Sequence, residues 1–93
     1  MRYEYDPEKS RSNKVKHGID FEEAQALWAD TYALRLDARS DTEPRYAVIG
    51  RIDDVLWTAF FTCRKEAARI ISVRRARKQE MKIYEEALAR RGT

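Results

Sequence analysis

The residues best suited to chemistry form a basic cluster at Arg74, Arg75, Arg77 and Lys78, within the stretch IISVRRARKQEMKIYEE. This stretch begins as a strand-like apolar run and continues with helix-like spacing, so the charges fall at the junction of two elements. Planar guanidinium groups bind phosphate oxygens in a bidentate manner, so arginines at this junction favour an anionic ligand. Arg77 and Lys78 are expected on the surface of the following helix, which leaves Arg74 and Arg75 as the stronger candidates.

The charge is unevenly distributed, although the net charge is only +3. Residues 1–62 carry 9 Lys and Arg against 12 Asp and Glu, whereas residues 63–93 carry 10 against 4. An anionic partner would therefore be attracted to the C-terminal third of the chain. A solvated basic helix would give the same counts.

With 93 residues, of which 43% are apolar, the chain is predicted to be a single globular domain over residues 1–93. It has no apolar window long enough to span a membrane and no hydrophobic signal region, so a cytoplasmic location without membrane association is expected. The single Cys63 cannot form an internal disulfide, and with one histidine it cannot build a metal site. We therefore expect neither a metal nor a cofactor.

Hydrophobic periodicity and turn signals predict elements in the order β-α-α-β-β-β-β-α. The predicted ranges are a short strand over 2–6, a helix over 7–18, a second helix after Asp20, strands over 32–37, 45–52, 55–63 and 69–75, and a helix from Ala76 to about Arg90. Short loops between the later strands leave no room for parallel crossovers, so an antiparallel sheet of about four strands is expected. Two N-terminal helices and one C-terminal helix would pack on this sheet, which is an α+β fold.

Local signals support three of these boundaries. Asp6, followed by proline, is typical of a helix N-cap. Asp20 and Glu23 have the spacing of a capping box. Asp53-Asp54 lies between two β-rich runs and indicates a hairpin, although it is a weaker turn signal than Asn-Gly.

Both halves of the chain resemble the BrnT toxin family. The N-terminal half has an aromatic-Asp pair, a Lys and an Asn in the first helix, Lys-His-Gly, and then Phe, Ala, an aromatic residue and Asp. These residues are Tyr5, Asp6, Lys9, Asn13, Lys16, His17, Gly18, Phe21, Ala24, Trp28 and Asp30. The matching features of the C-terminal half are PRYAVIG, Thr62, Arg64 and RIISVRRARKQEMKIYEE. The resemblance covers about residues 3–86, and Val73 stands where the family usually has alanine.

This resemblance implies the toxin half of a type II toxin–antitoxin pair, with a fold similar to that of RelE-type ribonucleases. It implies an RNA substrate, cleaved without a metal to inhibit translation. The partner would be a BrnA-like antitoxin with a ribbon-helix-helix region, in a heterotetramer that reaches promoter DNA only through the antitoxin.

RNA cleavage without a metal requires removal of the 2′-OH proton, stabilisation of extra negative charge on phosphorus, and protonation of the leaving oxygen. Arg64, Arg74 and Arg75 are the predicted charge-stabilising residues. His17 is the only histidine, and its ordinary titration near neutral pH makes it a candidate acid or base. A histidine at the end of a helix is also explained by the helix dipole.

Two of these assignments meet a geometric difficulty. If 55–63 and 69–75 are antiparallel neighbours, Arg64 lies at the far end of the sheet from Arg74. Adjacent strand residues such as Arg74 and Arg75 also face opposite sides. Tyr84 is a further catalytic candidate through its hydroxyl, but its helical spacing with Met81 predicts a core position first.

The remaining notable residues have structural interpretations. Glu80 is expected to form an ion pair with Arg77, Trp28 and Trp57 are expected to be core anchors, and Cys63 is not expected to be a nucleophile. Two alternatives to an enzyme remain: a non-catalytic module that binds nucleic acid or a partner, and an ordinary α+β domain whose charges serve only solvation. The uneven charge distribution disfavours the second alternative.

Overall fold

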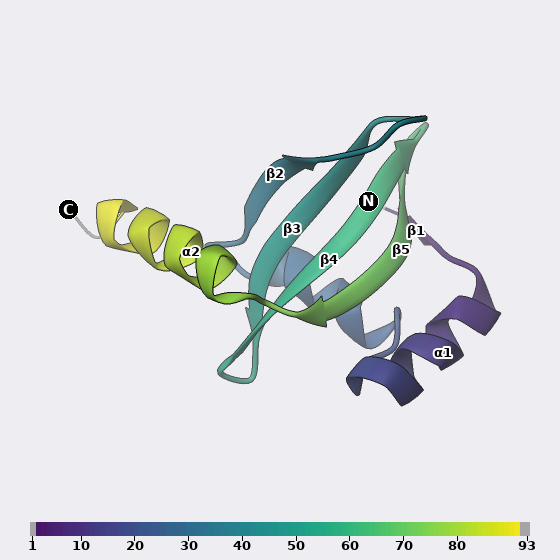
Figure 1. Cartoon of the computed structure of the whole chain (residues 1–93), viewed down its shortest axis with the longest axis horizontal. Coiled ribbons are helices and arrows are strands. Elements are labelled where there is room, and N and C mark those ends of the chain that lie inside the picture. Colours follow the sequence, from purple (N-terminus) through teal and green to yellow (C-terminus); the bar gives the residue numbers. More distant parts are fainter. Residues whose placement is uncertain (1, 92–93) are drawn as a thin grey trace.

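The computed structural model describes residues 2–91, which form five strands, two α-helices and one 3₁₀ helix. In chain order these are β1 (Arg2–Glu4), α1 (Pro7–His17), η1 (Glu23–Ala29), β2 (Leu34–Ala38), β3 (Arg45–Ile52), β4 (Val55–Arg64), β5 (Ala67–Arg75) and α2 (Lys78–Arg91). Figure 1 shows a twisted sheet with η1 behind it, α1 beside the lower end of β5, and α2 projecting to the left. The α+β class and the element order agree with the prediction.

The sheet differs from the prediction in its first strand. Its strand order is β1-β5-β4-β3-β2, and β2 to β5 form the expected antiparallel meander. β1 adds to the outer edge of β5 in a parallel orientation, with Tyr3 opposite Ala68. The expected antiparallel sheet of about four strands is therefore wrong, and the sheet is five-stranded and mixed. Parallel pairing is possible here because most of the chain separates β1 from β5, so no short crossover is needed.

Two tight hairpins connect the three central strands. Asp53 and Asp54 both have positive φ angles, 48° and 67°, as a two-residue type I′ turn requires. The predicted hairpin at these residues is confirmed. The second hairpin turns at Lys65, where φ is 55°, and Arg64 already pairs with Ala67. The predicted connection over 64–68 was therefore too long, and β5 begins two residues earlier than expected.

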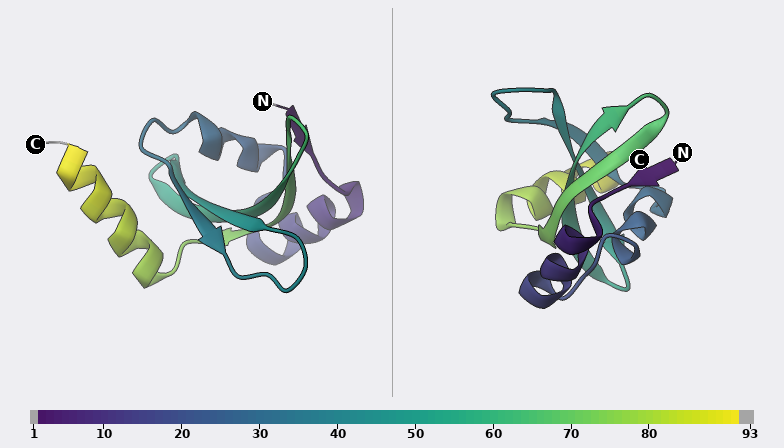
Figure 2. Two further views of the ribbon diagram at one scale, coloured as in Figure 1. Left: turned by 90° about the horizontal axis from the view of Figure 1, so that it is seen from above. Right: turned by 90° about the vertical axis from the view of Figure 1, so that its right-hand side faces the viewer.

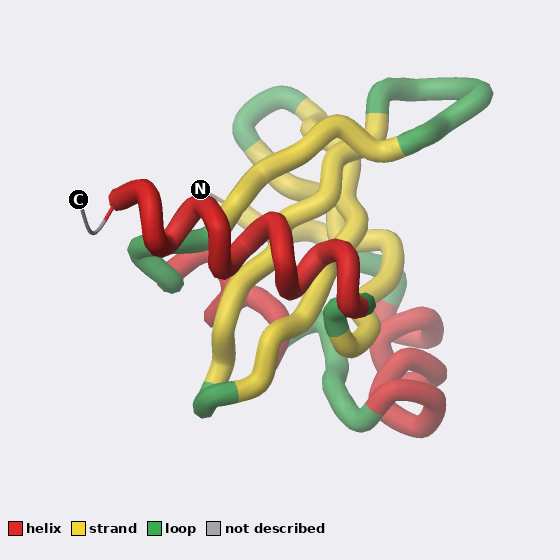
Figure 3. Tube along the Cα trace, turned by 60° about the vertical axis from the view of Figure 1, so that its left-hand side comes forward, coloured by secondary structure: helices red, strands yellow, loops and turns green. Residues whose placement is uncertain are grey.

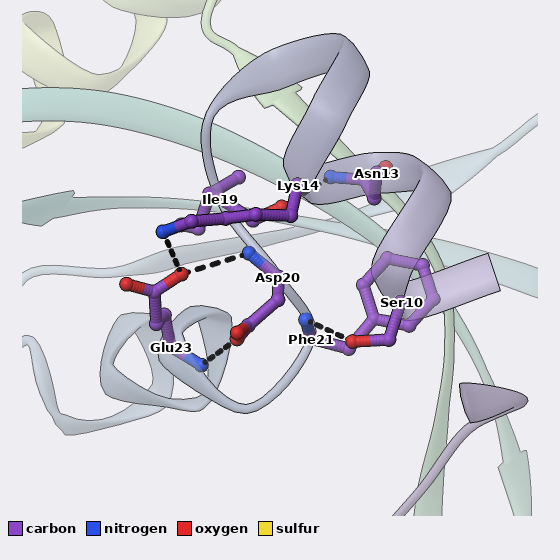
Figure 4. A network of polar contacts seen from close by, with 7 residues as sticks. All are labelled: Ser10, Asn13, Lys14, Ile19, Asp20, Phe21 and Glu23. Carbon is purple, nitrogen blue, oxygen red and sulfur yellow. Dashed lines mark hydrogen bonds and ion pairs between the residues drawn. The ribbon is translucent and has the colours of Figure 1, made fainter. Parts of the chain in front are cut away.

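The segment after α1 keeps its predicted start but forms a different helix. The backbone N–H of Asp20 donates to the Glu23 carboxylate at 3.0 Å, and the Glu23 N–H donates to the Asp20 carboxylate at 2.7 Å (Figure 4). This is the predicted capping box, although the helix is 3₁₀ over Glu23–Ala29 rather than α. A 3₁₀ helix rises about 2.0 Å per residue against about 1.5 Å for an α-helix. The seven residues therefore span about 14 Å, and they pack against β3.

Helix α1 closes the free edge of β5 beyond β1. Asp6 caps its first turn, and Gly18 ends it in the left-handed conformation, as predicted. The Asn13 side chain donates to the carbonyl of Val73 at 2.9 Å and accepts from the Val73 N–H at 3.2 Å. It also donates to the carbonyl of Ile19 at 2.8 Å. Asn13 therefore takes the place of a neighbouring strand and satisfies buried backbone groups of β5.

The core lies between η1 and the face of the sheet that curves around it (Figure 2, left). It is built from Ile19, Phe21, Ala24, Leu27, Val48, Ala59, Phe61, Ala68, Ile70 and Val73. Trp28 packs edge-on against Tyr3 and Phe61, with ring centroids 5.2 Å apart in both pairs. Trp28 and Trp57 are half-buried against the core, as their apolar surroundings predicted.

Helix α2 crosses the opposite face of the sheet at one end (Figure 3). The buried Tyr84 hydroxyl donates to Asp30 at 2.8 Å, and Arg91 donates to the carbonyl of Thr31 at 3.0 Å. The contacts fix α2 to the segment that joins η1 to β2. No helix in the described part of the chain is long and apolar enough to cross a membrane.

Gly50 of β3 lies close to Leu27 of η1. A Cβ atom at this position would lie 3.1 Å from the Leu27 carbonyl oxygen and 3.2 Å from Leu27 Cδ2. Because one of these neighbours is backbone, Gly50→Ala is expected to lower the free energy of unfolding by about 1–2 kcal/mol. Urea denaturation followed by tryptophan fluorescence measures this effect. An alanine variant as stable as the unmodified protein would show that η1 can move away from β3 at no cost.

Candidate functional site

Arg74 lies near the end of β5, opposite Thr58 of β4, as the antiparallel pairing predicted. Its side chain faces away from η1, on the side of the sheet that carries Ala47, Phe60, Thr62, Arg69, Ser72 and Arg74. We call this side the open face. The Arg74 guanidinium lies over the Phe60 ring, 5.1 Å from the ring centroid. Only 20% of the Arg74 side chain is exposed.

The partner of Arg74 is Glu80, in the first turn of α2. Arg74 Nη1 donates to Glu80 Oε1 at 2.7 Å, and Nη2 donates to Oε2 at 2.9 Å. The carboxylate also accepts from the Arg77 backbone N–H at 2.8 Å and the Thr58 hydroxyl at 3.0 Å. The predicted ion pair of Glu80 with Arg77 is thus wrong. Arg77 contacts Glu80 through its backbone N–H at the start of α2, and the guanidinium that pairs with Glu80 is that of Arg74 in β5.

These contacts stabilise the ionised form of Glu80. The hydrogen bond from Arg74, with those from Arg77 and Thr58, outweighs burial and lowers the pKa of Glu80 from 4.5 to about 2. A carboxylate that stays charged at pH 7 is a fixed counter-ion for Arg74 and is not suited to act as a general base near neutral pH.

Acid should weaken the fold through this carboxylate. Because the folded pKa is lowered, the stabilisation is present above the ordinary pKa of 4.5 and is lost as the pH falls toward about 2. We expect the stability difference between the unmodified protein and Glu80→Gln to shrink by about 2 kcal/mol from pH 7 to pH 3. Urea titrations at both pH values measure it, with Glu86→Gln, an exposed position in the same helix, as the control. A constant difference would contradict the pKa assignment.

The open face carries further polar groups along the strands. Thr62 of β4 pairs with Arg69 of β5. On the other side of β4, Tyr46 of β3 pairs with Phe61, so the preceding residue, Arg45, lies opposite Thr62. The Thr62 hydroxyl and Arg45 Nε are buried without a hydrogen-bond partner in the described structure. Among residues 2–91, the ion pair of Arg69 is a long one with Glu4, at 3.9 Å. Cations therefore extend along this face from Arg74 toward the β2–β3 loop.

Arg75 faces the other side of the sheet, as the alternation of strand side chains predicted. Arg75 pairs with Trp57 of β4, and its guanidinium lies 5.6 Å from the centroid of the Trp57 ring. It is exposed and borders a pocket of about 270 Å³ together with Arg51, Asp54 and residues of α2. The structure thus places Arg74 and Arg75 at one end of β5 but on opposite faces.

Arg64 is remote from Arg74. It ends β4 and pairs with Ala67, whereas Arg74 pairs with Thr58 six residues earlier in the same strand. Six residues of strand span about 20 Å. Its nearest charged partner among the ion pairs of the described residues is Glu43, at 4.0 Å. The expected separation of Arg64 from Arg74 is confirmed, so the two do not contact one phosphate in this conformation.

His17 is half-exposed in the last turn of α1. It lies one helical turn after Asn13, on the same side of α1, and Asn13 contacts Val73 of β5. Figures 1 and 2 both show the C-terminal end of α1 beside the C-terminal end of β5. His17 therefore belongs to an element that ends at the same corner of the molecule as β5, which carries Arg74 and Arg75.

Tyr84 has a structural position, as its spacing indicated. It is 2% exposed, and its hydroxyl donates to Asp30. Asp30 also accepts from the backbone N–H groups of Tyr32 at 2.9 Å and Arg51 at 2.8 Å. Burial would raise the pKa of Asp30, but the hydrogen bonds from Tyr32, Tyr84 and Arg51 lower it. Asp30 thus joins η1, β3 and α2 as a charged acceptor.

Sequence reasoning missed the partners on which the Arg74 site depends. The sequence predicts Arg77 as the partner of Glu80, and it identifies Phe60 only as part of an apolar strand. The alternation of the strand gave a usable signal for Phe60, since it places residues 58 and 60 on one face. The pairing of Thr58 with Arg74 then brings Phe60 to the same side.

The sequence profile of a family described as the ribonuclease toxin, BrnT, of type II toxin–antitoxin systems matches residues 5–80. The matched segment begins at Tyr5, directly after β1, and ends at Glu80 in the first turn of α2. A search of curated proteins finds no match.

Proposed function

The chain belongs to the BrnT family of ribonuclease toxins from type II toxin–antitoxin systems, and we propose that it is a metal-independent endoribonuclease that acts at the Arg74 end of the sheet. The observation that carries the location is the Arg74 guanidinium, which is fixed by Glu80 and lies over Phe60 on the open face. A guanidinium beside an aromatic ring suits single-stranded RNA, whose phosphates bind cations and whose bases stack on rings.

In the proposed reaction the 2′-OH of one nucleotide attacks its own 3′-phosphate. The new O–P bond forms a 2′,3′-cyclic phosphate, and the bond to the 5′-oxygen of the next nucleotide breaks. The base accepts the 2′-OH proton, and an acid protonates the leaving 5′-oxygen. Arg74 would stabilise the charge on the phosphoryl oxygens. His17 is the candidate for proton transfer, because α1 and β5 end at the same corner. Arg75, also at the end of β5, would add positive charge there.

Arg64 and Tyr84 have other proposed roles. Arg64, about 20 Å along the strand from Arg74, would bind the RNA backbone away from the cleaved bond. Tyr84 would act through the position of α2, since its hydroxyl is bonded to Asp30.

Cleavage of RNA in EDTA tests this function. The purified protein is expected to cut a single-stranded RNA in the presence of EDTA, leaving 2′,3′-cyclic phosphate ends. The same sequence with 2′-O-methyl groups should remain intact, because the nucleophile is blocked. His17→Ala is expected to slow cleavage, with Lys16→Ala, its exposed neighbour, as the control. Intact RNA at high protein concentration would contradict the enzymatic function.

The Arg74–Glu80 ion pair favours one alternative, a binding protein without catalytic activity. Because Glu80 neutralises Arg74, the same face could bind nucleic acid or a partner without catalysing a reaction. That protein would bind both the unmodified and the 2′-O-methyl RNA and cleave neither.

We also propose that a BrnA-like ribbon-helix-helix antitoxin neutralises the chain in the cytoplasm, in a heterotetramer. The antitoxin would cover the basic end of the open face or the outer edge of β2, which is an edge strand of the sheet. Promoter DNA would be bound by the antitoxin alone. Co-expression followed by light scattering should give two copies of each chain, and a complex with one copy of each would contradict the heterotetramer.

A further inference from the structure

Glu80 leaves one edge of the Arg74 guanidinium available. Arginine has five N–H donors in one plane. The two on Nη1 serve Glu80 Oε1 and the carbonyl of Arg75, at 2.7 Å and 3.1 Å. One on Nη2 serves Glu80 Oε2. The second Nη2 proton and the Nε proton have no acceptor among residues 2–91, and these two protons point along the same edge of the plane.

The carboxylate that holds Arg74 is itself fixed from two elements. Thr58 binds it from β4, and the Arg77 backbone N–H binds it at the start of α2. Glu80 therefore cannot rotate without losing contacts to both. The guanidinium carbon also lies over the Phe60 ring, 5.1 Å from its centroid. As a result, the direction of the remaining Nε and Nη2 protons is set by the fold rather than by a flexible side chain.

We infer that Glu80 is a positioning residue, which holds one fork of Arg74 so that the Nε–Nη2 fork receives two phosphate oxygens of the bound RNA. This inference rests on the proposed function and deepens it. A phosphate on the free fork does not have to displace Glu80, because each acceptor has its own pair of donors. The Arg74–Glu80 pair is thus part of the binding surface and not an autoinhibitory latch.

A positioning role and a blocking role of Glu80 predict opposite effects of Glu80→Gln. If Glu80 positions Arg74, this substitution loosens the guanidinium and lowers kcat about 10- to 100-fold, with a smaller change in KM. If Glu80 blocks Arg74, the substitution frees a cation and raises kcat/KM. Glu80→Asp retains the charge but is one methylene shorter, so it should restore little. The pH–rate profile should keep its shape in both variants, because Glu80 transfers no proton.

Matched variants separate positioning from loss of stability. Gly50→Ala crowds the contact between β3 and Leu27 of η1, away from the Arg74–Glu80 pair, and should reduce thermal stability while retaining kcat. Binding of a 2′-O-methyl RNA gives a second readout, and Glu80→Gln should weaken it about tenfold. Cleavage or binding by Glu80→Gln equal to or better than that of the unmodified protein would overturn the inference.

Failure of the proposed function gives a different pattern. If the unmodified protein binds the 2′-O-methyl RNA but cuts no RNA, the enzymatic function is overturned, and the binding readout still decides the role of Glu80. If the unmodified protein neither binds nor cuts, both proposals are overturned.

Discussion

Arg74→Ala is expected to lower kcat/KM for RNA cleavage by about 10²- to 10³-fold, the usual cost of removing one preorganised donor to a developing negative charge. The substitution removes the guanidinium that lies over Phe60 and leaves the phosphate without its bidentate partner. Initial rates with a short fluorescent RNA in EDTA measure this loss.

Two controls separate chemistry from folding in this variant. Arg74→Ala leaves the Glu80 carboxylate, 21% exposed, without its main partner, so the double variant Arg74→Ala/Glu80→Gln removes the unpaired charge and should fold better but remain inactive. Arg74→Lys retains the charge without a planar fork and should recover only part of the activity. Nearly full activity in Arg74→Ala would remove Arg74 from the site.

Asp30→Ala is expected to lower the free energy of unfolding by about 3 kcal/mol, because hydrogen bonds to a charged acceptor contribute more than neutral ones. The variant loses the acceptor for Tyr84, Arg51 and Tyr32 at once. The loosened helix α2 would also carry Glu80 away from Arg74, so activity should fall together with stability. Chemical denaturation and RNA cleavage on the same sample measure both effects.

Two smaller changes, at Asp30 and at its donor Tyr84, test whether the charge of Asp30 and its hydrogen bonds cause this loss of stability. Asp30→Asn retains acceptor atoms but not the charge, and Tyr84→Phe removes one donor only, so each should cost about 1 kcal/mol. An Asp30→Ala protein with unchanged stability would show that the carboxylate does not hold the three elements together.

Features set by a few neighbouring residues were predictable from the sequence. The cap at Asp6, the left-handed Gly18, the capping box at Asp20 and the turn at Asp53-Asp54 each depend on residues within one turn of each other. The meander followed from loop lengths, and the opposite orientation of consecutive arginines followed from strand alternation.

Features that join distant parts of the chain were not predictable. Asn13 reaches Val73 and Tyr84 reaches Asp30 across separations of 60 and 54 residues. Asn13 satisfies a backbone carbonyl of β5, and Tyr84 joins α2 to the end of η1. No pattern of neighbouring residues in the sequence reveals either contact. Likewise, Glu80 forms its ion pair with Arg74 and not with Arg77 because of where α2 begins relative to β5.

An NMR titration with a 2′-O-methyl RNA oligonucleotide, which binds without being cut, tests most directly whether Arg74 binds phosphate. We expect the Arg74 Nε proton to shift downfield as the free Nε–Nη2 fork binds phosphate, together with changes at Phe60 and Ser72 on the open face. Saturable binding with changes only on other surfaces, and an unshifted Arg74 Nε proton, would contradict this role of Arg74.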